Sequence, residues 1–172
     1  IYAFLYTPLK RYSPMAAVVG AIPGALPVVI GAAAWETQWS AMAFWLFVLQ
    51  FLWQFPHFWA VAWVADEDYK RAGFYLLPTR DGQKSRAVGL LSFAFCVLML
   101  VNIVLGYSTG LISLWAALLL GLINAYFAAK CWVLYRTCSD KDARQQMFAS
   151  FLHLPLSLLV VLADAITQSN IL

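Results

Sequence analysis

The sequence predicts an all-α protein, a polytopic bundle of transmembrane helices, and three observations support this fold class. Hydrophobic residues make up 63% of the 172 residues and charged residues only 11%, far from the balance of a soluble domain. The charges are separated by long uncharged runs, and these runs lack the period-two alternation of barrel strands. All eleven Lys and Arg residues fall on one side of the spans that the runs define.

The first two spans follow from uncharged runs of 24 and 29 residues. The first run lies between Arg11 and Glu36, and the second lies between Glu36 and Asp66. Because about 20 apolar residues in a helix cross the roughly 30 Å of hydrocarbon in a bilayer, each run predicts one transmembrane helix.

The remaining spans follow from two further runs. The uncharged run 87–129 has 43 residues, too long for one span, and it is interrupted at 106–110, where glycine and polar residues favour a tight turn. It therefore predicts two helices, and a final run of 19 residues at 145–163 predicts one more. The five spans are expected near residues 14–34, 40–65, 86–106, 111–133 and 146–165.

The basic residues predict one orientation for these spans. Lys and Arg cost about 2.5 to 3.5 kcal/mol each at the centre of a spanning helix and accumulate in cytoplasmic connections. The opposite connections, around Glu36, 106–110 and Asp164, contain none. The net charge of +3 thus indicates topology and gives no reason to expect a nucleic-acid partner. The basic residues are Lys10, Arg11, Lys70, Arg71, Arg80, Lys84, Arg86, Lys130, Arg136, Lys141 and Arg144.

The start of the chain indicates a fragment. The chain begins at Ile1 without an initiator Met, and residues 1–6 are typical of the last turn of a preceding helix. No signal-peptide pattern is visible, and the three cysteines have no spacing that indicates a metal site or a redox pair. We expect a multi-pass protein embedded in membrane lipid, in a bacterial inner membrane or, for a eukaryotic source, the mitochondrial inner membrane.

Polar residues at membrane depth are few, and three of them share one face of the second span. Gln50, Gln54 and His57 are spaced by four and three residues, which places them on one side of a helix. Continued along the helix, the same face reaches Asp68, although Pro56 is expected to bend the helix. The stripe therefore points to the acidic residues that end this span.

Acidic and basic residues meet directly after the second span. Asp66, Glu67 and Asp68 are followed closely by Lys70 and Arg71. Mg²⁺ binds through one or two carboxylates together with phosphate oxygens and water, and neighbouring Lys and Arg hold further phosphate oxygens. The cluster is consistent with a diphosphate site, or with a solvated helix end whose mixed charges have no ligand.

In the last span, Ser150, His153 and Ser157 again lie on one helical face. Intramembrane polar residues form interhelical hydrogen bonds or line a site, and the sequence leaves both roles open for His153. Asn102 and Asn124 are expected to join helices by hydrogen bonds.

Four stretches of the chain are similar to one protein family. They are residues 6–11 (YTPLKR), 20–27 (GAIPGALP), 53–60 (WQFPHFWA) with its continuation to Asp68-Tyr69, and 150–155 (SFLHLP). Their order and spacing resemble the protohaem IX farnesyltransferase, or haem O synthase, branch of the UbiA prenyltransferase superfamily. The resemblance covers essentially the whole chain.

This resemblance implies about nine transmembrane helices around a cavity, of which the chain would supply the last five. It also implies two acidic motifs that hold Mg²⁺ and a prenyl diphosphate; the motif at Asp68 looks like the second, and the first would lie upstream of Ile1. The donor would be farnesyl diphosphate and the acceptor a vinyl group of haem b. Contact with haem a synthase or the oxidase assembly machinery is a further expectation.

The resemblance and the residue chemistry together give a set of expected site residues. His57 and His153 are candidates for haem recognition, through the iron or through the propionates. The expected catalytic residues are Asp68, Tyr69 and His57; the metal ligands are Asp68 and Asp66; and the substrate-binding residues are Lys10, Arg11, Gln54, Lys70, Arg71 and His153.

Three alternatives stay open. A prenyltransferase of an aromatic quinone precursor would share the acidic cluster but has no need of the histidines. A haem-binding membrane subunit without enzymatic activity would use His57 and His153 as ligands and leave the charges near Asp68 dispensable. A transporter would be compatible with the Gly and Pro residues at 20–27, but it has no use for the acidic and basic cluster.

Overall fold

The computed structural model describes residues 16–35, 40–74, 76–79 and 83–169. Within these ranges the regular structure is entirely helical, which confirms the predicted all-α class. The helices are α2 (Ala16–Trp35), α3 (Ala41–Val64), α4 (Asp66–Arg71), α5 (Arg86–Ser108), α6 (Leu114–Thr137) and α7 (Asp140–Ser169). A long helix occupies most of each of the five ranges expected to span the membrane, and the short α4 was not expected.

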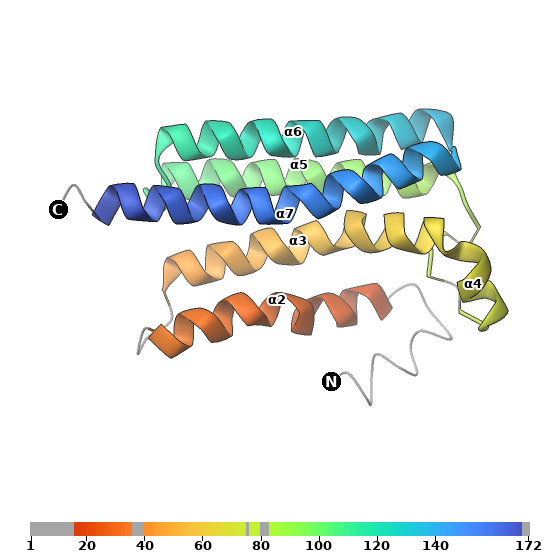
Figure 1. The fold of residues 1–172 in the computed structure, drawn as a ribbon, viewed down its shortest axis with the longest axis horizontal. Coiled ribbons are helices and arrows are strands. Elements are labelled where there is room, and N and C mark those ends of the chain that lie inside the picture. The colour runs from red at the N-terminus through yellow and green to blue at the C-terminus, as the bar shows by residue number, and fades with distance from the viewer. Residues whose placement is uncertain (1–15, 36–39, 75, 80–82, 170–172) are drawn as a thin grey trace.

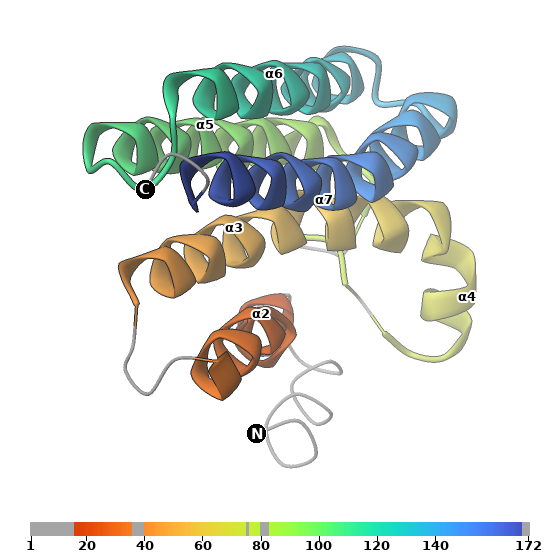
Figure 2. The same ribbon diagram turned by 60° about the vertical axis from the view of Figure 1, so that its left-hand side comes forward.

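The five long helices lie side by side in an antiparallel bundle (Figure 1). Helix α3 is central, because it packs against α2 and also against α5 and α7, while α6 packs against α5 and α7. The turned view shows α2 at the edge of the bundle beside α3 (Figure 2). The end of α3, the short α4, and the beginnings of α5 and α7 lie at the same end of the bundle (Figure 1).

That end of the bundle also carries the basic residues. Every Lys and Arg that the structure describes belongs to α4, the connection to α5, the first turn of α5, the second half of α6 or the beginning of α7. The folded arrangement therefore agrees with the single orientation expected from the positive-inside pattern.

Three of the helices are long and apolar enough to cross a membrane. They are α5, α6 and the part of α7 from Asp140 to Gln168. Helix α3 has 24 residues and no charged side chain, but two Gln and one His lower its apolar character. In α2 the apolar stretch Ala21–Gly31 is shorter. Length and composition thus establish three candidate spans within the described ranges.

Side-chain hydrogen bonds to backbone carbonyls join the helices, as predicted for Asn102 and Asn124. Asn102 Nδ2 donates to Trp45 O at 3.3 Å, and Trp45 Nε1 donates back to Asn102 O at 2.7 Å. Asn124 Nδ2 donates to Cys96 O at 2.9 Å. These bonds satisfy buried polar groups where lipid offers no partner, so they tie α3 to α5 and α6 to α5.

Two glycines allow close helix contacts. A Cβ on Gly89 would overlap the backbone nitrogen of Tyr135 in α6, and a Cβ on Gly106 would lie 2.6 Å from Nε1 of Trp45 in α3. Real side chains essentially never approach so closely. The missing side chains therefore set the distances of α5 from both neighbours.

The helix ends differ from the predicted spans at the basic end. Helix α7 begins at Asp140 instead of 146, and α6 continues to Thr137 instead of 133. The helices extend beyond the expected spans because an uncharged run measures the apolar part of a helix, whereas charged turns continue the helix into water. Ser139 Oγ accepts a hydrogen bond from Asp142 N at 3.2 Å and so caps the first turn of α7.

At the opposite end, the turn predicted at 106–110 is present. Gly110 adopts a φ of 73°, a conformation that suits glycine, and Leu111 N donates to Gly106 O at 2.9 Å. Helix α6 starts at Leu114 rather than 111, because Ser113 caps it by accepting a hydrogen bond from Ala116 N.

Candidate active site

The polar face predicted for α3 is divided between two neighbouring helices. Gln54 Nε2 donates to Ala21 O of α2 at 3.0 Å, and Gln50 Nε2 donates to Gly24 O of the same helix at 3.2 Å. Gln54 is buried, and a Cβ on Gly24 would overlap its amide oxygen. Both glutamines therefore anchor α3 to α2, a role that sequence reasoning did not separate from substrate binding.

His57 points instead to α7. Its Nδ1 lies 2.8 Å from Ser150 Oγ, and its ring is stacked on Trp53 at a centroid distance of 4.5 Å and an interplanar angle of 12°. Phe151 is nearly perpendicular to the ring, with the two ring centroids 5.1 Å apart. His57 is half-buried, and its Nε2 has no hydrogen-bond partner within the part of the chain that the structure describes.

His153 lies one turn further along α7 and is almost completely buried. Its ring is 2% exposed and packs against Phe127 at 5.3 Å. Neither of its ring nitrogens has a hydrogen-bond partner among the described residues. A buried imidazole without partners is costly, so His153 is a polar group available to a ligand or to a bound water.

The acidic cluster forms the short helix α4. Lys70 Nζ binds Asp66 Oδ2 at 2.8 Å, whereas Arg71 reaches Glu67 at 3.5 Å and Asp68 at 3.6 Å. The Asp66 side chain is 12% exposed, in contrast to 80% for Asp68. Because exposed ion pairs are weak, Asp68 and Glu67 remain accessible, while Asp66 is engaged by Lys70.

Tyr69 is half-buried in α4. Lys10 and Arg11, expected to bind substrate, lie outside the described residues.

A polar pocket of about 210 Å³ opens beside α4. Lys84 Nζ binds Asp140 Oδ1 at 2.7 Å, and the same carboxylate oxygen accepts a hydrogen bond from Trp63 Nε1 at 2.8 Å. Lys84 also lies over the Trp63 ring, 5.8 Å from its centroid. The pocket is lined by Val64, Ala65, Glu67, Asp68, Lys84, Asp140 and Arg144.

Lys84, Asp140 and Arg144 are pocket residues that sequence reasoning missed. They come from the connection before α5 and from the beginning of α7, far along the chain from Asp68. The one-sided charge pattern placed Lys84 and Arg144 at the same membrane surface. The packing of α7 on α3 brings Asp140 and Arg144 to the acidic cluster, and the connection before α5 brings Lys84, which binds Asp140.

The donor set of the pocket fits a magnesium diphosphate better than a metal ion alone. No group of three His, Cys, Asp or Glu side chains among the described residues could hold a metal ion. Asp68 and Glu67 are exposed carboxylates, and Lys84 and Arg144 are cations in the same pocket. Mg²⁺ characteristically takes one or two carboxylates and completes its shell with phosphate oxygens and water, so these residues suit it.

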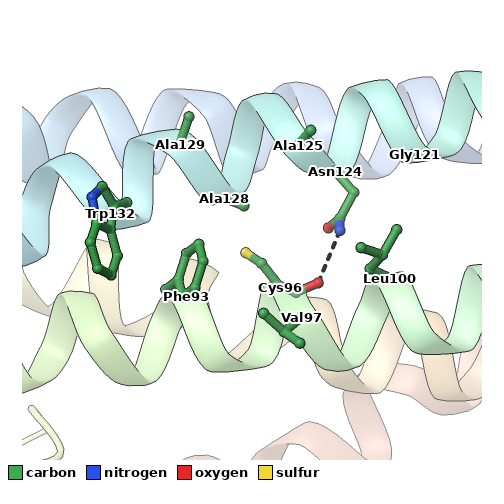
Figure 3. A pocket seen from close by; sticks show the side chains of 10 residues that line it. All are labelled: Phe93, Cys96, Val97, Leu100, Gly121, Asn124, Ala125, Ala128, Ala129 and Trp132. Carbon is green, nitrogen blue, oxygen red and sulfur yellow. Dashed lines mark hydrogen bonds between the residues drawn. The ribbon is translucent and has the colours of Figure 1, made fainter.

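A second cavity, of about 560 Å³, lies between α5 and α6 and has a different character (Figure 3). Its lining is apolar or small except for Asn124, whose amide bonds to Cys96 O across the groove. Cations and carboxylates do not line it. The polar pocket, and not this groove, therefore has the charges that diphosphate chemistry requires.

These features define a class of protein. The chain is a helical bundle of membrane-spanning character, with an acidic and basic pocket at the end of the bundle that carries its basic residues. Residues 1–154 match the UbiA prenyltransferase family, so the chain belongs to that family, and the resemblance inferred from the four stretches is confirmed.

Relatives agree with this placement. A Cytophaga hutchinsonii protein named protoheme IX farnesyltransferase is 45% identical over 171 residues, covering 96% of this chain and 58% of the relative. Proteins of the same name from Solibacter usitatus and Flavobacterium psychrophilum are 42% and 37% identical over 95% of this chain, covering 56% and 55% of their own lengths. The chain thus spans somewhat more than half the length of these relatives. No solved structure matches the chain.

Proposed function

We propose that the full-length protein transfers the farnesyl group of farnesyl diphosphate to a vinyl group of haem b, giving haem o and diphosphate. The family membership and the names of the relatives support this reaction class. The observation that carries the proposal is the polar pocket, in which exposed Asp68 and Glu67 face Lys84 and Arg144 directly at the end of the helix that bears His57.

We also propose that more helices cross the membrane than the three candidate spans. Helices α2 and α3 cross the bilayer with α5, α6 and α7, as the last five of about nine helices, in a bacterial inner membrane. The polar pocket then lies at the cytoplasmic surface, where the basic residues belong. The first acidic motif, in the part of the relatives' length that this chain does not span, completes the site.

Lys84 and Arg144 bind the diphosphate in this proposal. Both line the pocket, and Lys84 is held by Asp140 and Trp63 in a fixed position. A guanidinium binds phosphate oxygens with two parallel hydrogen bonds, while an ammonium acts as a point charge. Lys70 and Arg71, expected from the sequence to bind diphosphate, are not among the residues that line the pocket, and they pair with carboxylates of α4, so they are assigned a supporting role.

Asp68, with Glu67, holds the Mg²⁺. Both are exposed and border the pocket, whereas the Oδ2 atom of Asp66 is already bound by Lys70. Mg²⁺ held there would neutralise charge that develops on the leaving diphosphate. We therefore infer that Asp66 positions Lys70 and does not bind the metal.

The reaction balances with one water molecule. The allylic carbon–oxygen bond of farnesyl diphosphate breaks and diphosphate leaves, stabilised by Lys84 and Arg144. The vinyl carbon of haem b forms a bond to the allylic carbon, water adds its oxygen to the adjacent carbon, and one proton is released. The aromatic side chains around His57 limit the access of bulk water to the reacting carbons.

The depth of His57 suits a haem whose vinyl edge faces the pocket. His57 and Val64 are seven residues apart in α3, about 10 Å along the helix axis. Val64 already lines the pocket. A porphyrin with its iron near His57 can therefore place a vinyl group close to a diphosphate-bound allylic carbon. His153 remains a candidate for a propionate or for the iron.

The test uses membranes that contain the full-length protein, supplied with haem b, farnesyl diphosphate and Mg²⁺. Haem o, identified by chromatography and mass, is the expected product with the parent. Asp68→Asn should lower the rate at least about a hundredfold, because about 2.7 kcal/mol or more of leaving-group stabilisation would be lost. An undiminished rate with Asp68→Asn, or in a metal chelator, would refute the metal assignment.

Lys84 offers a matched pair of variants. Lys84→Met should raise the KM for farnesyl diphosphate about tenfold or more, as expected for loss of a phosphate contact. Lys141→Met, at the same end of the bundle but outside the pocket lining, should leave the kinetics unchanged. Equal effects of both variants would indicate a general surface-charge effect and contradict the pocket assignment.

The same incubation separates the alternatives. If a quinone precursor is prenylated and haem b is not, the proposed acceptor is wrong and the assignment of the pocket to diphosphate still stands. A stoichiometric bound haem b that is never converted, in a protein whose Asp68→Asn variant behaves like the parent, would favour a haem-binding subunit. A contact with haem a synthase or the oxidase assembly machinery stays a prediction, for which co-purification is the measurement.

A further inference from the structure

The Ser150 hydroxyl group stands between two hydrogen-bond partners but has a single proton to donate. Its Oγ lies 2.6 Å from Met147 O in the preceding turn of α7 and 2.8 Å from His57 Nδ1 in α3. A carbonyl oxygen is only an acceptor, so a contact of 2.6 Å between two oxygens requires the hydroxyl proton to lie between them. The proton of Ser150 is therefore used by Met147 O.

This assignment fixes the proton on His57. Because the Ser150 proton points to Met147, the Oγ atom can only accept from the imidazole, and Nδ1 of His57 must carry the hydrogen. In the neutral ring, Nε2 then has a free lone pair. With the opposite tautomer, Ser150 would have to donate its proton to His57 Nδ1. Ser150 Oγ and Met147 O would then lie 2.6 Å apart without a proton between them, which is unfavourable.

The surroundings hold the ring in the same orientation. Trp53 stacks on one face of His57 and at the same time donates its Nε1 hydrogen to Ser150 O at 3.0 Å. Phe151 of α7 makes a nearly perpendicular ring contact with His57. The serine, the ring and the tryptophan thus form one unit across the α3–α7 contact, in which the aromatic side chains set the ring plane and the hydroxyl sets the tautomer.

We propose that Ser150 is a positioning residue that holds His57 as the Nδ1-protonated tautomer and leaves the Nε2 lone pair for the iron of haem b. The second part of this inference rests on the proposed function. A neutral imidazole ligates iron through an unprotonated nitrogen, and the hydrogen bond of the other nitrogen commonly orients such a ligand. Ser150 and His57 are separated by 93 residues in the sequence, and no spacing rule connects them.

The tautomer is measured on the full-length protein without haem. Protein labelled with ¹⁵N-histidine is purified in detergent at neutral pH, and long-range ¹H–¹⁵N spectra report which ring nitrogen carries the proton. The His57 signals are assigned by their loss in His57→Gln. A protonated Nδ1 and an unprotonated Nε2 are expected, and a protonated Nε2 would overturn the inference.

Variants test the role of the hydroxyl. In Ser150→Ala the Nδ1–H tautomer should lose its dominance, and the Kd for haem b, followed by its absorption spectrum, should rise about tenfold or more, the usual effect of removing a hydrogen bond that orients a metal ligand. Ser150→Thr keeps a hydroxyl that also bonds within the helix and should restore both properties. Ser157→Ala, a buried serine two turns further along α7, is the matched control and should change neither.

The two readouts separate this inference from the proposed function. If Ser150→Ala keeps the Nδ1–H tautomer and the parent affinity while His57→Gln loses affinity, the positioning role is overturned although haem binding stands. If the parent shows the expected tautomer, and Ser150→Ala loses it, but haem b never binds, the positioning of His57 is supported and the haem assignment fails.

Discussion

Replacing Gly89 by alanine would place a methyl group inside the α5–α6 contact. The new Cβ would overlap Tyr135 N, lie 2.7 Å from Tyr135 Cα, and lie 3.0 Å from the carbonyl carbon of Leu134. All three atoms belong to the backbone of α6, so no side-chain rotation can relieve the overlap. The two helices would have to move apart along their whole contact.

The expected cost follows from two opposing effects. Overpacking a well-packed contact costs about 1 to 3 kcal/mol. Alanine in place of glycine within a helix stabilises the folded protein by about 0.5 to 1 kcal/mol. The net destabilisation of Gly89→Ala is therefore about 0 to 2.5 kcal/mol, with a central value of about 1 kcal/mol. Gly121→Ala is the matched control, because its Cβ meets nothing within 4 Å and only the favourable propensity of about 0.5 to 1 kcal/mol applies.

The assay is reversible unfolding of the full-length protein in mixed micelles by increasing the fraction of denaturing detergent, followed by far-ultraviolet circular dichroism. The two variants should differ by about 2 kcal/mol, with opposite signs relative to the parent. If Gly89→Ala is as stable as Gly121→Ala within about 0.5 kcal/mol, α5 and α6 are not in backbone contact at this point, and the packing described for them is wrong.

Two further outcomes are expected. Asp164→Asn should destabilise the same unfolding transition by about 1 to 3 kcal/mol. The buried carboxylate accepts hydrogen bonds from Ser113 N at 2.9 Å and Ser113 Oγ at 2.5 Å, and an amide leaves one donor unpaired. Unchanged stability would contradict the contribution of these hydrogen bonds. A water-soluble maleimide should label half-buried Cys138 in the folded protein, whereas buried Cys96 and Cys131 should react only after unfolding. Mass spectrometry measures the labelling. Labelling of Cys96 and Cys131 in the folded state would contradict the α5–α6 packing.

The long helices could be predicted from the sequence because lipid excludes charge, so each uncharged run marks the part of a helix that avoids water. The ends could not be predicted in the same way. Helix α7 continues to Asp140 because its charged first turns are helical in water, and the short α4 forms where the sequence shows only a cluster of charges. Local caps such as Ser139 set these ends, and their effect is independent of hydropathy.

The candidate site was predicted only in part, for a geometric reason. The sequence identified Asp68 from local clustering, and the structure places it at a polar pocket. It could not identify Asp140 or Arg144, because their approach depends on how α7 packs on α3, nor Lys84, because the connection before α5 brings it to Asp140. The sequence also grouped Gln54 with the site. Helical spacing shows which residues share a face of α3, but it does not show which neighbouring helix that face contacts, and Gln54 contacts α2.

The anchoring of α3 explains how the histidine and the pocket could keep a fixed spacing. Side chains of α3 donate hydrogen bonds to backbone carbonyls of three different helices: Gln54 to α2, Trp45 to α5 and Trp53 to α7. Sliding α3 along its axis would break all three bonds together, since each acceptor belongs to a different neighbour. Because His57 and the pocket residue Val64 lie on this same helix, an imidazole in the bundle and a charged pocket at its end are fixed relative to each other by one rigid element. The proposed reaction joins a membrane-embedded acceptor to a diphosphate-anchored donor, and such a reaction requires a fixed separation.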